Sequence, residues 1–251
     1  MRAAALALTL TLVSSTSVAR AAPDDLDRAY VYDGAMVPLL YLPLTANLTL
    51  RRFGNVRTEP LWFSDDASLG RPAQKSQVPH WASFAAAGTV GAYMLWADDS
   101  RYFHLKGLAQ TLVLTTTATQ IFKYTFGRRR PSYKIGQDNP VNARKSFVSG
   151  HASLSAADAS YAGLYLRYQG FDRFRDGVTW WEVTTFDGLA GLALYVPYTR
   201  VRDHHHHLAD VIAGSMLGAG IAAAVFFYQQ GRYDDAARES RAAPIVVTLP
   251  F

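Results

Sequence analysis

The sequence contains no cysteine, so disulfide bonds, covalent haem attachment and thiol catalysis are all excluded. Charged residues are also scarce, because they make up 18% of the chain against about 25% in an average soluble domain. No long stretch alternates apolar and polar residues, which argues against strands. Without crosslinks, stability must come from a hydrophobic core, and 49% of the 251 residues are hydrophobic.

Positive charge is present but modest. The net charge is +5, and two of the basic residues, Arg2 and Arg20, lie in the apolar N-terminal segment. The remainder is therefore only mildly basic. This balance suits an anionic substrate or a membrane surface, and it is too weak to predict nucleic-acid binding.

Residues 1–21 have the pattern of a secretory signal peptide. Arg2 supplies the positive start, Ala3 to Val13 is an apolar run, and Ala19-Arg20-Ala21 offers small residues for cleavage. An uncleaved N-terminal anchor is the alternative. Both predict an exported protein in the periplasm, either soluble or associated with the membrane.

The rest of the chain reads as one helix after another. We expect an N-terminal extension with short helices over 22–79, a helical-bundle domain over 80–230 and a polar tail over 231–251. In the extension, Pro38 and Pro43 argue against one continuous helix over 31–50. In the domain, residue composition predicts helices over 80–97, 149–168, 181–198 and 206–228, an apolar stripe predicts a helix over 103–124, and 127–145 is expected to be a basic loop. The predicted class is all-α, a helical bundle.

The relation of this bundle to a membrane is left open by the sequence. The stretch from Leu208 to Tyr228 is long enough to span a bilayer and carries one charge, Asp210. Gly214 and Gly218 form a small-residue pair that lets helices approach closely. The central helix of a water-soluble bundle has the same apolar profile, so both a peripheral and an embedded protein are compatible with it.

The stretch from Thr199 to Asp210 carries groups that suit phosphate chemistry. Arg200 can hold a phosphate by two hydrogen bonds, and His206 can attack phosphorus. Asp210 follows His206 by one helical turn and can fix which ring nitrogen is free. Two matching pieces lie upstream, namely Lys123 followed after six residues by Arg130-Pro131, and then Ser149-Gly150-His151.

In order and spacing, the three pieces resemble the type 2 phosphatidic acid phosphatase and haloperoxidase superfamily. Its signature is lysine, six residues and Arg-Pro; then Pro-Ser-Gly-His; then Ser-Arg, five residues, histidine, three residues and aspartate. The resemblance covers roughly residues 80–228 and implies that family's helical-bundle fold. Val148 stands in place of the proline and Thr199 in place of the first serine of the third piece. The loss of the proline is expected to loosen the backbone at Ser149 and Gly150, but no ionisable group is lost, so an active enzyme is expected.

The resemblance implies a role for each residue. Phosphate-ester cleavage requires positioned cations and N–H donors around the phosphate. By resemblance, the phosphate is bound by Lys123, Arg130, Ser149, Gly150 and Arg200. His206 is implied to be the nucleophile that forms a phosphohistidine, with Asp210 holding its other nitrogen. His151 is implied to protonate the leaving oxygen and then activate water, and this scheme needs no metal or other cofactor.

Several of these residues also have structural alternatives. The basic cluster at 128–130 can be a solvated face, Ser149 a helix N-cap and Asp210 an acid that complements a helix dipole. The run from His204 to His207 is compatible with a zinc site, although consecutive residues point around a helix and rarely converge on one ion.

Further side chains near the motifs have two possible uses. Arg144 and Lys145 either extend the anion pocket or face solvent, and Arg202 is expected to face solvent. The aromatic set either lines an acyl-chain groove or packs in the core, which is the commoner use; it comprises Tyr93, Trp96, Tyr102 and Phe103.

The predicted function is hydrolysis of phosphate monoesters or of lipid phosphates or pyrophosphates, of the phosphatidic acid type. The expected partners are such a lipid or small monoester and a membrane surface. A non-catalytic, membrane-associated protein that binds lipid phosphate is the alternative, motivated by Val148 and Thr199. A vanadium-dependent haloperoxidase is a second alternative, since vanadate mimics the five-coordinate transition state of phosphoryl transfer.

Overall fold

The computed structural model describes residues 36–55, 70–75, 82–97, 101–133, 140–170 and 180–242. Within these ranges every regular element is helical, which confirms the all-α prediction. The elements are α3 (Met36–Phe53), α4 (Ala82–Ala97), α5 (Arg101–Phe126), α6 (Pro140–Ala143), α7 (Gly150–Tyr165), the π-helical turn η2 (Leu166–Gly170), α8 (Trp180–Arg202) and α9 (Leu208–Ala242). The predicted signal peptide and the end of the predicted tail lie outside the described residues.

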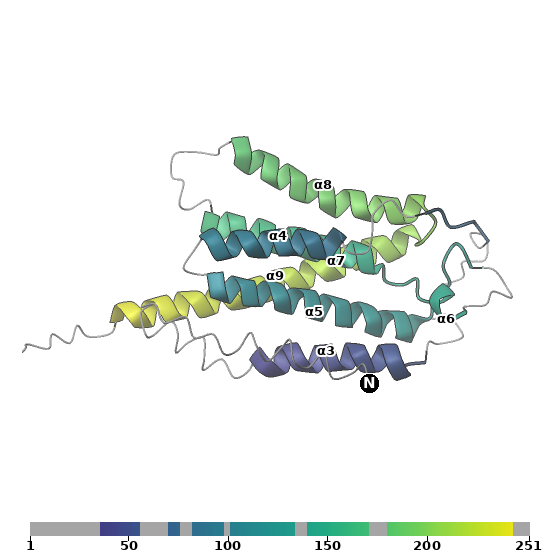
Figure 1. Ribbon diagram of the computed structural model, residues 1–251, viewed down its shortest axis with the longest axis horizontal. Coiled ribbons are helices and arrows are strands. Elements are labelled where there is room, and N and C mark those ends of the chain that lie inside the picture. The colour runs from purple at the N-terminus through teal and green to yellow at the C-terminus, as the bar shows by residue number, and fades with distance from the viewer. Residues whose placement is uncertain are drawn as a thin grey trace, which may run out of the picture.

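The long helices lie side by side along the long axis of the bundle (Figure 1). α7 is the central element, because it packs against α4, α5, α8 and α9, and α3 packs against α5. α5 and α8 end, and α7 and α9 begin, at the same end of the bundle (Figure 1). The loops at this end are therefore brought together by the packing of helices that are far apart in the sequence.

Two of these helix ends carry residues that favour the end or the start of a helix. Gly127 follows α5 with φ +58°, and its N–H donates to the carbonyl of Lys123 at 3.3 Å, which is a glycine stop in the left-handed region. Asp210 lies in the first turn of α9, where a negative charge complements the helix dipole. The chain thus leaves α5 and enters α9 beside the predicted site.

The core lies in the middle of the bundle and is built from α4, α5, α7 and α9. Its buried side chains are Met94, Leu108, Ala157, Tyr161, Tyr165, Ala222 and Phe226. Phe103 is buried and the ring of Tyr93 packs edge-on against Tyr165, so these two members of the aromatic set serve the core. The side chains of Trp96 and Tyr102 lie outside the described part.

Two sequence predictions about helix ends were wrong. α3 is continuous through Pro43, whose carbonyl accepts a hydrogen bond from Thr117 of α5 at 2.8 Å. Pro38 lies in the first turn, where backbone N–H groups have no partner within the helix in any case. Packing on α5 therefore overrides the local cost of one interior proline. α9 also runs past Gly231 to Ala242, into the segment predicted as a tail.

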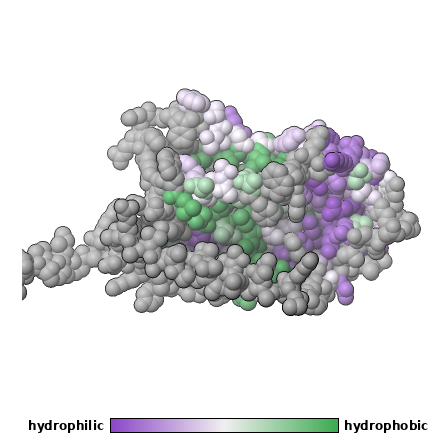
Figure 2. Space-filling view, in the orientation of Figure 1, coloured by the Kyte–Doolittle hydropathy of each residue, from purple (hydrophilic) through white to green (hydrophobic). Residues whose placement is uncertain are grey.

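Polar and apolar surfaces are separated along the bundle. Figure 2 shows hydrophilic side chains gathered at the end where α5 ends and α9 begins, and hydrophobic ones over the middle. Among the described residues, one helical stretch, Leu208–Asp235, is long and apolar enough to cross a membrane. Length and composition alone are weak evidence, since the core helix of a soluble bundle also meets them.

Candidate active site

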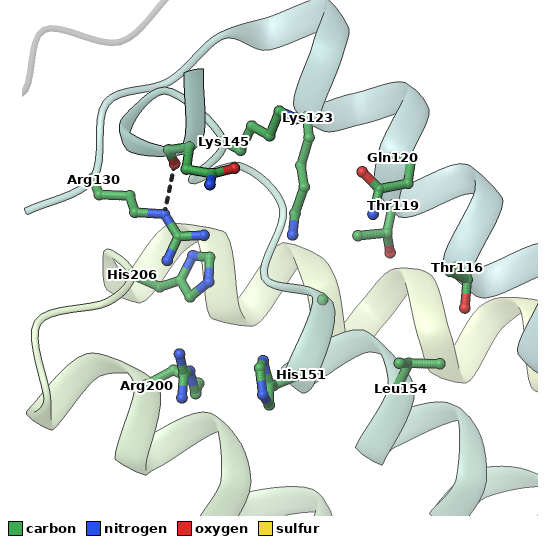
Figure 3. Close-up of a pocket in the computed structure, with 12 residues that line it drawn as sticks. Thr116, Thr119, Gln120, Lys123, Arg130, Lys145, His151, Leu154, Arg200 and His206 are labelled. Carbon is green, nitrogen blue, oxygen red and sulfur yellow. Dashed lines mark hydrogen bonds between the residues drawn. The ribbon is translucent and has the colours of Figure 1, made fainter. Parts of the chain in front are cut away.

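Residues of α5, α6, α7, α8 and the adjoining loops surround one cavity at the hydrophilic end of the bundle (Figure 3). The cavity has a volume of about 340 Å³. Its lining residues are Thr116, Thr119, Gln120, Lys123, Arg130, Asn142, Lys145, Gly150, His151, Leu154, Arg200 and His206. All of the residues predicted from the sequence line it except Ser149 and Asp210, which are fully buried.

His206 and Asp210 face each other as their spacing predicts. The Nδ1 atom of His206 lies 3.6 Å from Oδ2 of Asp210, just beyond hydrogen-bond distance, and both side chains are almost completely buried. The backbone N–H of His206 donates to the carbonyl of Arg200 at 3.1 Å, which ties the loop before α9 to the end of α8. With Nδ1 on the aspartate side, Nε2 is the nitrogen that can face the cavity.

Burial lowers the pKa of His206 to about 3. Asp210 opposes this shift, while the positive charges of Arg130 and Lys123 add to it. His206 is therefore neutral at physiological pH, with a ring nitrogen able to act as a nucleophile.

Asp210 is held by partners that the sequence did not single out. Its Oδ1 accepts from Nη1 of Arg128 at 2.6 Å, and its Oδ2 accepts from the hydroxyl of Ser146 at 2.5 Å and from the backbone N–H of His207 at 3.0 Å. Burial alone would raise the pKa of Asp210, but His206, Arg128 and Ser146 together hold it below its usual value. The carboxylate is thus charged and fixed in orientation. No pattern distinguishes Arg128 from its two arginine neighbours, so sequence reasoning could not have found it.

Arg130 and Arg200 bring two guanidinium groups close to His206 (Figure 3). Nε of Arg130 donates to the carbonyl of Asn142 at 3.1 Å, which holds the side chain in place. Burial lowers the pKa of Arg130. Burial, and next the charge of Arg130, lower the pKa of Arg200 to about 10, with Asp203 opposing. Two crowded, partly desolvated cations of this kind favour a bound anion.

Lys123, Gly150 and His151 complete the predicted set. The ammonium of Lys123 lies so near the start of α7 that a Cβ on Gly150 would be 3.3 Å from it. His151 is the second residue of α7 and shares the cavity with Arg200 and His206 (Figure 3). A ligand in this cavity would therefore contact groups from all three sequence motifs.

Ser149 occupies the N-cap position of α7 but is not placed like a phosphate ligand. Its side chain is fully buried, makes no capping hydrogen bond and does not line the cavity. Its backbone N–H donates to the carbonyl of Asp210 at 3.0 Å. That bond joins the second motif to the third and holds the backbone beside Val148.

Other lining residues continue the motifs by helical periodicity. Thr116, Thr119 and Gln120 lie seven, four and three residues before Lys123 on α5, and Leu154 lies three residues after His151 on α7. That periodicity is a signal by which the sequence could have identified them. They form the cavity wall away from the arginines (Figure 3).

The structure also settles the use of the nearby basic residues. Lys145 lines the cavity, whereas the guanidinium of Arg144 lies over the ring of Tyr133, 5.7 Å from its centroid. Arg202 pairs with Asp203 at 2.9 Å and does not line the cavity.

Three of the four consecutive histidines point to different places. The ring of His204 lies 3.1 Å from the carbonyl of Pro72, and Nε2 of His207 lies 3.0 Å from the carbonyl of Arg129. His206 lines the cavity. In the described part of the chain, no group of three or more histidine, cysteine, aspartate or glutamate side chains is placed to hold a metal ion.

A short segment, residues 70–75, lies against the outside of the site. The N–H of Arg71 donates to the carbonyl of Pro131, and that of Gln74 donates to the carbonyl of Asp203, each at 3.1 Å. It therefore joins the loop after α5 to the loop before α9. The sequence contains no pattern that predicts these contacts.

Taken together, the described part of the chain is a helical bundle with a cation-lined cavity and a buried His–Asp pair at one end. Residues 105–234, just over half of the chain, match the PAP2 superfamily, and the chain belongs to this family. The match includes all three motifs.

The sequence is also similar to those of several phosphatases. Phospholipid phosphatase 1 of Rattus norvegicus is 33% identical over 164 residues, covering 55% of this chain and 51% of its own length. Phospholipid phosphatase 2 of Homo sapiens is 30% identical over 143 residues, covering 46% and 47%. A PA-phosphatase related-family protein of Dictyostelium discoideum is 28% identical over 144 residues, covering 55% and 53%. The chain spans about half the length of the curated relatives it matches.

Proposed function

We propose that this protein is a phosphatase that hydrolyses lipid phosphate monoesters of the phosphatidic acid type through a phosphohistidine on His206. One observation carries the proposal: one cavity holds four cationic side chains and a histidine backed by a buried aspartate, and none of the described residues that line it is acidic. Four positive charges without a negative one favour a multiply charged anion. The names of the phospholipid phosphatases to which the chain is similar favour a phosphorylated lipid.

In this scheme the cations hold the non-bridging oxygens of the phosphate. Arg130 and Arg200 flank His206, and a guanidinium can bind two oxygens at once. Lys123 approaches from α5, and its ammonium lies beside the start of α7 (Figure 3). The negative charge that spreads over the equatorial oxygens in the transition state is thus met by cations from α5, from the loop after it and from α8.

The first step transfers the phosphoryl group to His206. Nε2 attacks phosphorus, the bond from phosphorus to the ester oxygen breaks, and its electron pair leaves with that oxygen. His151, which lines the same cavity, donates a proton to the leaving oxygen. The charge that His206 acquires is compensated by Asp210, whose Oδ2 lies 3.6 Å from Nδ1.

The second step releases phosphate. His151, now neutral, accepts a proton from water, and the oxygen of that water attacks phosphorus as the bond to Nε2 breaks. The lowered pKa of His206 favours this outcome, because the ring leaves as the neutral base and does not retain a proton. The scheme draws all of its positive charge from side chains.

Exposed apolar side chains beside the site support a lipid substrate and a membrane surface as partners. Leu208, Ile212 and Met216 lie one helical turn apart on α9, starting beside the cavity, and are 62%, 52% and 71% exposed. Leu194 and Tyr198 are exposed near the end of α8. Apolar surface of this kind favours contact with lipid chains.

Phosphate release in the presence of a metal chelator tests the proposal. The substrates are p-nitrophenyl phosphate and dispersed phosphatidic acid, and the proteins are the parent, His206→Ala and His205→Ala. His205 is a matched control, since it is the adjacent histidine and does not line the cavity. We expect chelator-resistant release by the parent and by His205→Ala, faster with phosphatidic acid, and none above background by His206→Ala.

Two other outcomes have definite meanings. Release that persists in His206→Ala would refute the phosphohistidine step. Tight binding of phosphatidic acid by the parent without any release would favour a non-catalytic lipid-phosphate-binding protein instead.

A further inference from the structure

His207 is a histidine of the four-residue run that the proposed scheme does not use. Its ring reaches the loop after α5, residues 127–131, because its Nε2 lies 3.0 Å from the backbone carbonyl of Arg129. A carbonyl oxygen only accepts hydrogen bonds, so Nε2 of His207 carries the proton and donates it to this bond. The ring of His207 therefore links the segment that carries His206 to the loop after α5.

The loop after α5 delivers cations to the site from alternate positions. Arg128 pairs with Asp210 at 2.6 Å. Arg130 lines the cavity beside His206 (Figure 3). Arg129, between them, has its guanidinium over an aromatic ring and does not line the cavity. The position of the backbone at Arg129 therefore affects how both neighbouring cations reach the site.

Backbone hydrogen bonds to residues 143–146 also hold this loop. The N–H of Arg130 donates to a carbonyl there at 2.8 Å, and the carbonyl of Arg128 accepts from an N–H there at 3.0 Å. The carbonyl of Arg129 is used differently, since it accepts from His207. The bond from His207 is therefore the one of these three that fixes the loop relative to the segment before α9.

Close packing is incomplete between the two segments. A second cavity of about 160 Å³ is lined by residues of both, among them Pro131, His206 and His207. Where side chains do not touch, packing cannot hold a loop in place. Another bond between the same segments, from Nη1 of Arg130 to the carbonyl of His205, is long at 3.5 Å. The shorter bond from His207 is thus the stronger link.

We propose that His207 is a positioning residue, which places Arg130 against the phosphate by holding the carbonyl of Arg129. The inference rests on the proposed function. Arg128 is fixed directly by its ion pair with Asp210, so the bond from His207 acts mainly on the part of the loop that carries Arg130. His207 does not line the active-site cavity and acts without touching the substrate. A small displacement of Arg130 would leave its charge in the cavity but misalign its paired hydrogen bonds to phosphate.

Two replacements of His207 separate its hydrogen bond from its ring. His207→Phe keeps a ring and loses the donor, whereas His207→Gln keeps an amide donor near the place of Nε2. With p-nitrophenyl phosphate we expect kcat/KM to fall about tenfold or more in His207→Phe, and His207→Gln to recover most of the loss. His204→Gly is the matched control, because it removes a ring bonded to the carbonyl of Pro72, and glycine adopts the φ of +58° at this position without strain. The control should retain the parental rate.

Double-variant cycles test whether His207 acts through Arg130. In an Arg130→Gln background, His207→Phe should lower kcat/KM by less than about twofold further, because the residue that it positions is already gone. In a Lys123→Gln background it should keep its full effect, since Lys123 reaches the cavity from α5 and not from this loop. Equal effects in both backgrounds, with a lowered melting temperature in His207→Phe, would show that His207 only stabilises the fold and would overturn the inference. A parental rate in His207→Phe would overturn it as well.

Binding of inorganic phosphate separates this inference from the proposed function. Titration calorimetry requires no turnover, and the same cycle applies to Kd. We expect His207→Phe to raise Kd for phosphate several-fold in the parent and in Lys123→Gln, and not in Arg130→Gln. If this pattern holds while the parent hydrolyses neither p-nitrophenyl phosphate nor phosphatidic acid, the positioning role stands and the phosphatase proposal fails. Turnover by the parent without the pattern in either cycle would reject the positioning role alone.

Discussion

Arg128 and Asp210 form a buried ion pair, with Nη1 of the arginine 2.6 Å from Oδ1 of the aspartate. The pair leaves Oδ2 on the side of His206, 3.6 Å from Nδ1. It also fastens the loop after α5 to the first turn of α9, because the two residues are 82 positions apart in the sequence. One interaction thus sets both the orientation of the site and the packing of the end of the bundle.

We predict that Arg128→Gln both destabilises the protein and slows the reaction. Breaking a buried pair by removing one partner costs about 3–5 kcal/mol, since Asp210 would keep an uncompensated charge. If Asp210 were less well oriented and transition-state stabilisation fell by only about 1.4 kcal/mol, kcat would fall about tenfold. Thermal unfolding and kcat on p-nitrophenyl phosphate measure the two effects. Arg129→Gln is the control, because Arg129 lies over the ring of Tyr133 and does not line the cavity. A parental melting temperature in Arg128→Gln would disprove the structural part.

The contact of α9 with the start of α7 yields a second prediction. A Cβ on Gly214 would lie 2.7 Å from the carbonyl oxygen of Ser149, whose N–H is bonded to Asp210. Gly214→Ala should therefore displace the backbone that leads into Gly150 and lower both stability and activity. Gly220→Ala on the same helix meets nothing within 4 Å and should be neutral or stabilising by up to about 1 kcal/mol. Unfolding and activity measurements on the two variants decide this, and equal behaviour would contradict the close approach.

The exposed stripe on α9 supports a third prediction. Replacing Ile212 and Met216 together by asparagine should weaken binding to vesicles containing phosphatidic acid by about tenfold or more, because each buried apolar side chain contributes about 1.5–3 kcal/mol. Hydrolysis of soluble p-nitrophenyl phosphate should be unchanged. Ala209 and Ala224 are exposed on the same helix, and their replacement by asparagine is the control. Vesicle flotation measures the bound fraction, and an equal decrease in both double variants would argue against the stripe.

Much of the fold and of the cavity could be predicted from the sequence, because the evidence for them is local. An apolar stripe predicts α5, residue composition predicts α4, α7 and α8, and the spacing of His206 and Asp210 by one helical turn predicts that they face each other, as found. The motif residues that line the cavity stand at helix ends, where spacing along the chain determines which side chains meet. The chemical roles assigned to them remain predictions.

What the sequence did not reveal depends on contacts between distant segments. Ser146 and Arg128 meet Asp210 only after α5, α7 and α9 have packed, and no local pattern distinguishes them. Likewise, the sequence around Pro43 predicts a break in the helix, because the stabilising contact of Pro43 is with Thr117, 74 residues away. Tertiary packing decided each of these cases.

Asp158 provides the last prediction, which concerns pH. It lies in the middle of α7, is 1% exposed, and neither of its carboxylate oxygens has a hydrogen-bond partner in the structure. Burial raises its pKa from 3.8 to about 8. The folded protein therefore holds Asp158 as the neutral acid, while the unfolded chain ionises it above pH 4. Folding therefore binds a proton at Asp158. The free energy of unfolding is highest below the unfolded pKa of Asp158 and falls as the pH rises towards 8.

Asp158→Asn removes this dependence, because the amide has the same shape and no charge to lose. Since one pKa unit corresponds to about 1.36 kcal/mol, the variant should gain up to about 4 kcal/mol over the parent between pH 5 and pH 8. Chemical unfolding at both pH values measures the gain. Asp187→Asn, at an exposed position of α8, controls for the general effect of removing a carboxylate. If the difference between Asp158→Asn and the parent were the same at pH 5 and pH 8, Asp158 would have to be ionised in the folded protein, and α7 would have to supply it with a partner or with water.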